Sequence, residues 1–397
     1  AAEAINVYGT LSASSGSNIV SGVVSLQDGS TLDVAANAAL VMNGMTPAIG
    51  SNVVTKTGPG LLRFAADPNQ NGTLVINEGV VEFQHSGSTD MHYIINPNGT
   101  LRQNTKDDLG DNYQIQIDGV LDFRNNDTIG GILGSGVITN SGSSAVAITV
   151  GTLNQSGLFS GKICNGAGSA TLAVSKTGSG FLTLSGASTF SGGFTVSGGM
   201  LNINNGGSTS SESAIGTGNF TISGSCVLDN TSGADVTLLP TINKFWNADF
   251  TFAGTKSLNL GLGTVTLGAN RTVTVATNTL TVGGAISGAF TLTKNGAGTL
   301  VLNGTNTYTG STSINGGALV INGLTGTGSL SLNSGLLGGS GLVNGAVTVS
   351  AGSVVAPGDL GSVGTLSLGA GSSALTVNST AFAFDLSTVA GNCDYLK

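Results

Sequence analysis

The stretch LTKNGAGTLVL, residues 292–302, joins two apolar runs through a Gly-rich corner. Its central block, Ser/Thr-Lys-Thr/Asn-Gly-x-Gly, occurs three times, at residues 55–60, 175–180 and 293–298. The lysines Lys56, Lys176 and Lys294 are therefore 120 and 118 positions apart. A short apolar run follows each block, at residues 61–64, 181–184 and 299–302. Even spacing of one pattern predicts an array of stacked units, and such arrays are more often scaffolds than catalysts.

Further short strands are predicted after each corner. The second strands lie at residues 73–77, 194–197 and 312–315, and the third strands at 80–83, 200–203 and 318–321. Along most of the chain apolar residues alternate with Thr, Ser or Asn, as in Val347-Thr348-Val349. This period of two indicates strands with one side in a core and the other in water. Gly and Asn between the strands supply the positive φ angles of tight corners.

Composition agrees with an all-β chain. Gly makes up 65 of 397 residues, Pro only 6, and charged residues only 8%. Scarce Pro and the lack of a three-residue Gly period exclude collagen, and 39% apolar content excludes a solvated coil. With a net charge of −8 and only 12 Lys plus Arg, no nucleic-acid partner is expected. No apolar run is long enough for a transmembrane helix, so no transmembrane segment is predicted.

Three all-β architectures are compatible with short strands and no helical segments: a sandwich, a propeller and a parallel β-solenoid. A propeller would show a shorter period and more aromatic residues than the 5% found here, and several sandwiches would need clear linkers. The pattern favours a right-handed parallel β-helix, a single elongated rod with roughly 20–25 residues per coil. We expect one continuous β-solenoid over residues 1–397, with supra-repeats at approximately 1–118, 119–237 and 238–397.

Two stretches resemble a known family. Residues 159–163 followed by 172–203, and residues 292–323, are similar to the autotransporter-associated β-strand repeat of bacterial passenger domains. Residues 55–84 look like a degraded copy, in which DPNQNG replaces the Asn-Thr-Tyr-Thr-Gly run at 306–310. Residues 249–284 are similar to sequence that precedes this repeat in very large secreted bacterial proteins. The resemblance implies a secreted or surface β-solenoid and implies little about activity.

Candidate chemistry is confined to residues 82–127. The charged residues and histidines there are Glu82, His85, Asp90, His92, Arg102, Lys106, Asp107, Asp108, Asp111, Asp118, Asp122, Arg124 and Asp127. A functional groove or a solvated loop between coils would each explain this concentration, and the acids at 107–111 could offer oxygen ligands to calcium but lack EF-hand spacing. The three repeated lysines are expected to be solvent-exposed and chemically idle. We predict no catalytic, cofactor or metal site, and no enzyme activity.

The chain ends indicate self-association. A strand is expected at Ile5–Tyr8, almost at the start, and another near the end, without polar caps. Solenoids need caps because a terminal coil exposes unpaired backbone and apolar core. Between Arg271 and Asp359 the only charged residue is Lys294, so charges that discourage strand pairing are scarce. The predicted assembly interface comprises Ile5, Val7, Tyr8, Phe382, Phe384, Leu386, Cys393, Tyr395 and Leu396, with Cys393 able to form an intermolecular bond.

We therefore expect an extracellular or cell-surface structural protein, in which copies assemble head to tail into a fibre. The alternative is a passenger-type adhesin that binds glycan or neighbouring cells through residues 85–127 or a Thr-rich flank. A polysaccharide-degrading β-helix enzyme ranks last.

Overall fold

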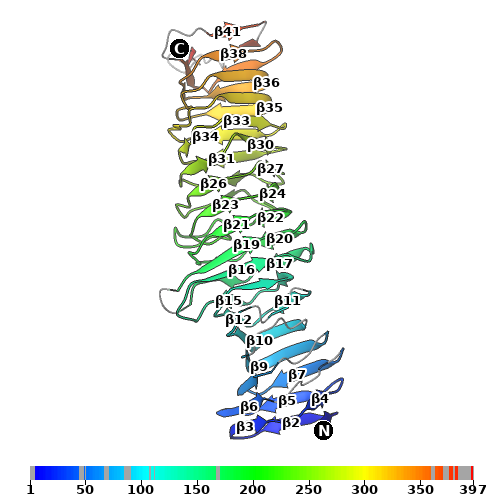
Figure 1. Ribbon diagram of the computed structural model, residues 1–397. Coiled ribbons are helices and arrows are strands. Elements are labelled where there is room, and N and C mark those ends of the chain that lie inside the picture. The colour runs from blue at the N-terminus through cyan, green and yellow to red at the C-terminus, as the bar shows by residue number, and fades with distance from the viewer. Residues whose placement is uncertain are drawn as a thin grey trace. The chain divides into compact units, whose positions relative to one another are not determined.

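The computed structural model describes residues 5–43, 49, 51–66, 71–84, 91–106, 109–110, 112–166, 170–358, 363–369, 375–378, 381–382 and 395–396. It divides into two compact units, residues 1–194 and 195–397. In the described residues the regular structure is strand, and the pairs are parallel, so the predicted parallel β-solenoid is confirmed. Within each unit the strands lie one above another (Figure 1). The three predicted supra-repeats stay a prediction.

The strands of the first unit are β1 (Ile5–Val7), β2 (Thr10–Ala13), β3 (Gly16–Val20), β4 (Val24–Leu26), β5 (Thr31–Val34), β6 (Ala38–Met42), β7 (Val53–Thr57), β8 (Leu61–Phe64), β9 (Thr73–Phe83), β10 (His92–Gln103), β11 (Gln114–Ile117), β12 (Val120–Phe123), β13 (Asp127–Ile129), β14 (Gly131–Leu133), β15 (Val137–Thr139), β16 (Val146–Val150), β17 (Gly157–Phe159), β18 (Lys162–Ile163), β19 (Leu172–Lys176) and β20 (Phe181–Leu184).

After β21 (Phe194–Val196), the strands of the second unit are β22 (Met200–Ile203), β23 (Phe220–Ile222), β24 (Cys226–Asp229), β25 (Val236–Thr237), β26 (Lys244–Trp246), β27 (Phe250–Phe252), β28 (Leu258–Asn259), β29 (Val265–Leu267), β30 (Arg271–Val275), β31 (Thr279–Val282), β32 (Ile286–Ser287), β33 (Leu292–Asn295), β34 (Thr299–Leu302), β35 (Thr312–Ile321), β36 (Leu330–Gly339), β37 (Leu342–Val343), β38 (Val347–Val349), β39 (Val354–Pro357), β40 (Thr365–Leu368), β41 (Thr376–Val377), β42 (Ala381–Phe382) and β43 (Tyr395–Leu396).

The strands predicted directly after the lysine corners are confirmed with the same bounds, as β8, β20 and β34. The prediction of separate second and third strands was wrong in two copies, where each pair forms one long strand, β9 or β35. The first half of β9 pairs with β7 and its second half with β8, so β9 turns a corner without losing its ladder. Gly79 (φ 76°) and Gly317 (φ 62°) make these bends.

In-register columns of apolar residues form the core. In the first unit Leu40, Leu62, Val81, Leu101 and Leu121 pair in succession, and each is at most 2% exposed. Burying one such side chain contributes about 1.5–3 kcal/mol. This burial therefore stabilises the strand register in which each apolar residue of a column lies above another.

A column in the second unit shows the same arrangement. Its members pair in succession and are fully buried: Leu280, Leu300, Leu319, Leu337 and Val355. The length of a coil is more variable than the predicted 20–25 residues. Paired residues differ by 17 positions in one place and by 30 in another, between Val120 and Val137 and between Thr365 and Tyr395. The turns absorb most of this variation, and the ladders between β9 and β10 and between β35 and β36 also contain register shifts.

Candidate functional site

The predicted assembly residues at the N-terminal end lie in and beside β1, which pairs with β4. Ile5 is 59% exposed and Tyr8 77% exposed, whereas Val7 is half-buried. Strands β2 and β3 follow the same scheme and pair with β5 and β6. In the described part of the chain each of these three strands has one paired edge, so the other edge carries backbone groups that no strand there satisfies.

At the C-terminal end, β41, β42 and β43 each pair on one side among the described residues, with β38, β39 and β40. Phe382 is 38% exposed. Tyr395 and Leu396 form β43. The remaining predicted interface residues, Phe384, Leu386 and Cys393, lie outside the described residues.

Three charged residues of the 82–127 region, Glu82, Arg102 and Asp122, form a ladder of ion pairs with Arg63 on adjacent strands. Arg63 on β8 donates to Glu82 on β9 at 2.8 Å, and Arg102 on β10 donates to both Glu82 and Asp122, each at 2.8 Å. The register places Arg63 opposite Glu82, Glu82 opposite Arg102, and Arg102 opposite Asp122. Each carboxylate thus meets an opposite charge one coil away, and no second acid faces it across the ladder.

This ladder changes the acidity of Glu82. Burial alone would raise the pKa of Glu82, but hydrogen bonds from Arg102 and Arg63 hold it below its ordinary value. Asp122 is 2% exposed and also accepts bonds from the backbone N–H and hydroxyl of Ser141. In these contacts the acidic side chains hold successive coils together. The expectation of a solvated loop was therefore wrong for Glu82, Arg102 and Asp122.

The other acids and histidines of this region are scattered. Asp118 accepts bonds from Gln116 and Ser135, and these bonds lower its pKa. Asp127 accepts the N–H of Thr128 and of Leu109. His92 lies beside Tyr113, and burial lowers its pKa. Arg124 reaches Asp122 at 3.7 Å, and Lys106 is exposed. His85, Asp90, Asp107, Asp108 and Asp111 lie outside the described residues.

The prediction of exposed lysines at the repeated corners was wrong. Lys56 and Lys294 are fully buried, and Lys176 is 2% exposed. The sequence carries a signal for this burial: Lys294 follows Leu292 by two positions, so strand alternation points both side chains toward the core. A fourth buried lysine, Lys244 on β26, has no Gly-x-Gly corner after it, and our sequence analysis missed it.

Each corner lysine binds backbone carbonyl oxygens. Lys294 Nζ donates to Asn295 at 3.1 Å and to Gly296 at 2.9 Å within its own corner, and to Gly316 at 3.0 Å one coil later. Lys56 repeats this pattern with Thr57, Gly58 and Glu78, at 2.7, 2.6 and 3.1 Å. In both copies the third acceptor lies 22 residues after the lysine. The ammonium group therefore ties two successive corners together with its three N–H groups.

Glycine is required at this corner by both conformation and space. Gly58 and Gly296 have φ angles of 72° and 84°. A Cβ atom at either position would lie 2.3 Å from a carbonyl oxygen of the preceding coil, that of Val34 or of Val275. The Lys-x-Gly spacing thus combines a close approach of two coils with a cation that binds the carbonyl groups gathered there.

Burial of these lysines shifts their acidity. Removal from water lowers the pKa of Lys56, Lys244 and Lys294 from 10.5 to about 8. For Lys56, the nearby Asp33 and Glu78 act in the opposite direction. The carbonyl oxygens around Lys294 also favour the charged form, because only an ammonium group can donate to all three of them.

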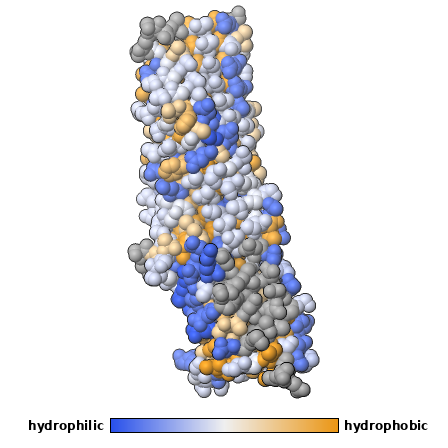
Figure 2. All heavy atoms as spheres, in the orientation of Figure 1, coloured by the Kyte–Doolittle hydropathy of each residue, from blue (hydrophilic) through white to orange (hydrophobic). Residues whose placement is uncertain are grey.

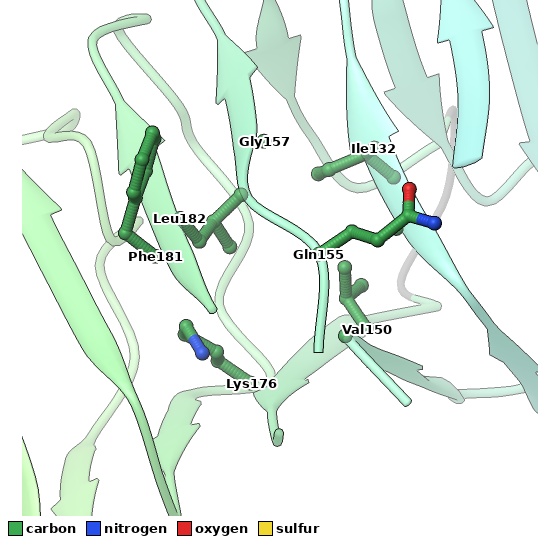
Figure 3. A pocket seen from close by; sticks show the side chains of 9 residues that line it. Ile132, Val150, Gln155, Gly157, Lys176, Phe181 and Leu182 are labelled. Atoms are coloured by element: carbon green, nitrogen blue, oxygen red, sulfur yellow. The ribbon is translucent and has the colours of Figure 1, made fainter. Parts of the chain in front are cut away.

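Lys176 borders a cavity of about 10 Å³, which is room for one water-sized sphere. In Figure 3 the side chains of Ile132, Val150 and Leu182 surround this space, with Lys176 beside them. Lys176 Nζ donates to the carbonyl oxygens of Thr177 and Gly178, at 2.9 and 3.3 Å. The cavity is far too small for a substrate, so it does not suggest a binding pocket.

Two larger, shallow clefts lie on the outer side of the second unit. One, of about 230 Å³, is lined by Ser225, Cys226, Asp249, Phe250, Thr251, Thr272 and Thr274. The other, of about 340 Å³, is lined by Asp235, Val236, Thr237, Ser257, Leu258, Asn259, Thr279 and Thr281. Hydroxyl groups and one carboxylate characterise both linings. No group of three or more metal-ligating side chains occurs among the described residues.

Among the described residues there is no helix that is long and apolar enough to cross a membrane. A comparison with protein families matches the passenger-associated transport repeat at residues 174–203 and 292–321. These ranges contain Lys176 and Lys294 with their corners, and the copy at Lys56, outside them, makes the same inter-coil bonds as Lys294. Comparisons with curated proteins and with solved structures give no match. The two repeats and the parallel β-solenoid together fit an autotransporter passenger-type repeat protein.

Proposed function

We propose that this chain is an extracellular structural protein whose copies associate head to tail through the open edges of their terminal strands. The observation that carries this proposal is the edge formed by β1, β2 and β3, each paired on one side only among the described residues. An open edge offers N–H and C=O groups to a further strand, which is the basis of β-augmentation. Burial of exposed Ile5 and Tyr8 would add apolar contact.

Strand direction is compatible with this mode of contact. The pairs within each unit are parallel, and β41, β42 and β43 also have one paired side in the described residues. A first coil of one copy that added to the last coil of another would continue the same parallel ladder. Such a contact joins two different surfaces, so it does not close on itself and propagates into a filament.

The charge distribution supports association. The only charged residue at positions 272–358 is Lys294, and its side chain is fully buried. Charged side chains on strands oppose pairing with other chains, and this region presents none of its own. We propose a secreted or surface location on the passenger-type repeat, and a structural rather than an enzymatic role.

Backbone geometry identifies a selective test. Ile5 donates its N–H to Val23, and Val7 accepts from Gln27, so alternation turns the N–H of Asn6 to the open edge. The same alternation on β2 turns Ser12 to that edge, since Gly9 and Ala13 accept bonds from the next coil. Replacing Asn6 and Ser12 with Pro removes two open-edge donors and keeps the bonds to β4 and β5.

Light scattering and electron microscopy of the purified chain over a range of concentrations should show filaments. The Asn6→Pro/Ser12→Pro double variant should remain monomeric, whereas Asn6→Ala/Ser12→Ala, which keeps both N–H groups, should assemble as the parent does. A parent chain that stays monomeric at every concentration, or a proline variant that assembles normally, would contradict the proposal.

A further inference from the structure

A column of outward hydroxyl groups crosses successive strands of the second unit. Its members pair in register on β30, β33, β35, β36, β38 and β41, and all are half-buried or exposed: Thr272, Thr293, Ser313, Ser331, Thr348 and Thr376. Neighbouring strands are about 4.8 Å apart, so the hydroxyl groups repeat at that interval along the stack. We call these six residues the hydroxyl column.

A second column lies two residues further along the same strands. It comprises Thr274, Asn295, Asn315 and Asn333. The amides bond to one another, with Asn315 donating to Asn295 at 2.9 Å and Asn333 donating to Asn315 at 2.8 Å. These bonds hold the amide planes along the stack, and an amide has further N–H and lone-pair capacity for a ligand. The two columns form a polar surface without charged side chains.

The 230 Å³ cleft opens at one end of both columns, since its lining includes Thr272 and Thr274. Asp249 stands one coil before Thr272, and its Oδ1 atom accepts the N–H of Thr272 at 3.0 Å and Arg271 Nη1 at 3.2 Å. These bonds orient the carboxylate, whose side chain remains 54% exposed. The second oxygen, Oδ2, is then available as an acceptor for a ligand hydroxyl group.

The 340 Å³ cleft has the same chemistry on neighbouring strands. Asp235 Oδ1 accepts the N–H of Ser257 at 3.0 Å, one coil later. Thr237, Asn259 and Thr281 pair in register along its floor. Both clefts therefore combine one backbone-oriented carboxylate with hydroxyl and amide groups that repeat from coil to coil.

We propose that this surface binds a neutral linear glycan that lies along the stack, with sugar hydroxyl groups on Asp249 and on the hydroxyl column. The uncharged columns offer no cation for an anionic glycan, and the net charge of −8 disfavours one. Sugar hydroxyl groups both donate and accept, which matches carboxylate, amide and hydroxyl partners. A polymer lets several weak contacts act together.

On the face shown in Figure 2, much of the second unit has the pale colour of intermediate hydropathy, with blue and orange patches between. A flat ice lattice could also match repeated hydroxyl groups. The clefts favour a glycan, because a sugar ring can enter a hollow beside Asp249 whereas a flat lattice cannot. The proposal uses the outer side of the strands and does not depend on head-to-tail assembly.

The test uses the full chain and affinity electrophoresis in gels that contain neutral polysaccharides (hydroxyethyl cellulose, laminarin, xyloglucan or galactomannan) or anionic alginate. At least one neutral polymer should retard the parent chain, and alginate should not. The Thr272→Val/Thr293→Val variant removes two hydroxyl groups without changing side-chain shape, and Asp249→Asn removes the charge. Each should weaken retardation about tenfold, since two hydrogen bonds are lost or one charge-assisted bond is weakened.

Thr266→Val is the matched control, because Thr266 is an exposed Thr on β29, outside the hydroxyl column, and this variant should bind like the parent. The Asn6→Pro/Ser12→Pro variant should also bind, which separates this proposal from the assembly proposal. The proposal is overturned if neutral polymers fail to retard the chain, if alginate binds more strongly, or if the hydroxyl-column variants bind normally. Inhibition of ice recrystallisation that Thr293→Val abolishes would reassign the surface to ice.

Discussion

The Nζ atom of Lys294 lies 3.0 Å from the carbonyl oxygen of Gly316, on the next coil of the solenoid. Lys56 reaches Glu78 in the same way, so the contact recurs in a second copy of the corner. An ammonium group in a core is costly unless its N–H groups are bonded. Here three carbonyl oxygens at the tight glycine corners supply that bonding, and the cation in turn satisfies carbonyl groups that a buried turn would leave unpaired.

The first prediction concerns loss of this cation. Lys294→Met keeps an apolar stem of similar length but leaves three carbonyl oxygens without their donor. We expect the coils at residues 292–321 to lose about 1–3 kcal/mol of stability, measured as faster amide hydrogen exchange in β33 and β35. Lys256→Met alters an exposed lysine of the same unit and should leave exchange unchanged. Equal protection in both variants would show that the lysine contacts contribute nothing.

The second prediction concerns alkaline pH. The folded-state pKa of Lys294 is about 8, against 10.5 for an ordinary lysine, so the unfolded chain binds more protons between these values. Stability should therefore rise as pH increases from about 8 to 10.5. The unfolding midpoint across that range should increase in the parent and increase less in Lys294→Met. An identical slope for the two chains would contradict the lowered pKa.

The third prediction concerns acid. Hydrogen bonds from Arg102 and Arg63 hold the pKa of Glu82 below its ordinary value of 4.5. The folded state therefore binds fewer protons there, and stability supplied by Glu82 is present above pH 4.5 and lost as pH falls through the lowered pKa. The first unit should unfold more readily in this acidic range, as followed by circular dichroism.

A Glu82→Gln variant tests the same ladder at neutral pH. It leaves two partly buried arginines facing a neutral group, and we expect a loss of about 3–5 kcal/mol. Asp28→Asn is the control, because exposed Asp28 accepts only a backbone N–H that an Asn oxygen can also accept. Should both variants unfold at the same midpoint, the ladder would not stabilise the fold.

The fourth prediction separates two reasons for glycine. Gly296 and Gly233 share positive φ angles, 84° and 90°, but only Gly296 has a carbonyl oxygen 2.3 Å from the position of a Cβ atom. Gly233→Ala should cost roughly 1–2 kcal/mol from backbone conformation alone. Gly296→Ala should cost more, because the coil of Val275 must move. Thermal unfolding of both variants measures the difference, and equal losses would leave no role for close coil approach.

The sequence by itself determined the all-β class, the bounds of β8, β20 and β34, and the stacked repeat. Alternation of apolar and polar residues and Gly-rich corners are local signals, and neighbours in the chain suffice to interpret them. Alternation also pointed Lys294 toward the core, although our prediction placed it in solvent. Burial of a lysine can be predicted only when the acceptors of its ammonium group are known. The third acceptor of Lys294, the carbonyl oxygen of Gly316, lies 22 residues away in the sequence.

Only the tertiary structure decided which residues stand above one another. Coil lengths between 17 and 30 residues hide the register that pairs Arg102 with Glu82 and Asp122, or Thr272 with Thr293. In the sequence these residues look like a charge cluster and a scatter of threonines. Stacking at about 4.8 Å converts them into an ion-pair ladder and a regular hydroxyl column, because backbone pairing between coils fixes their register.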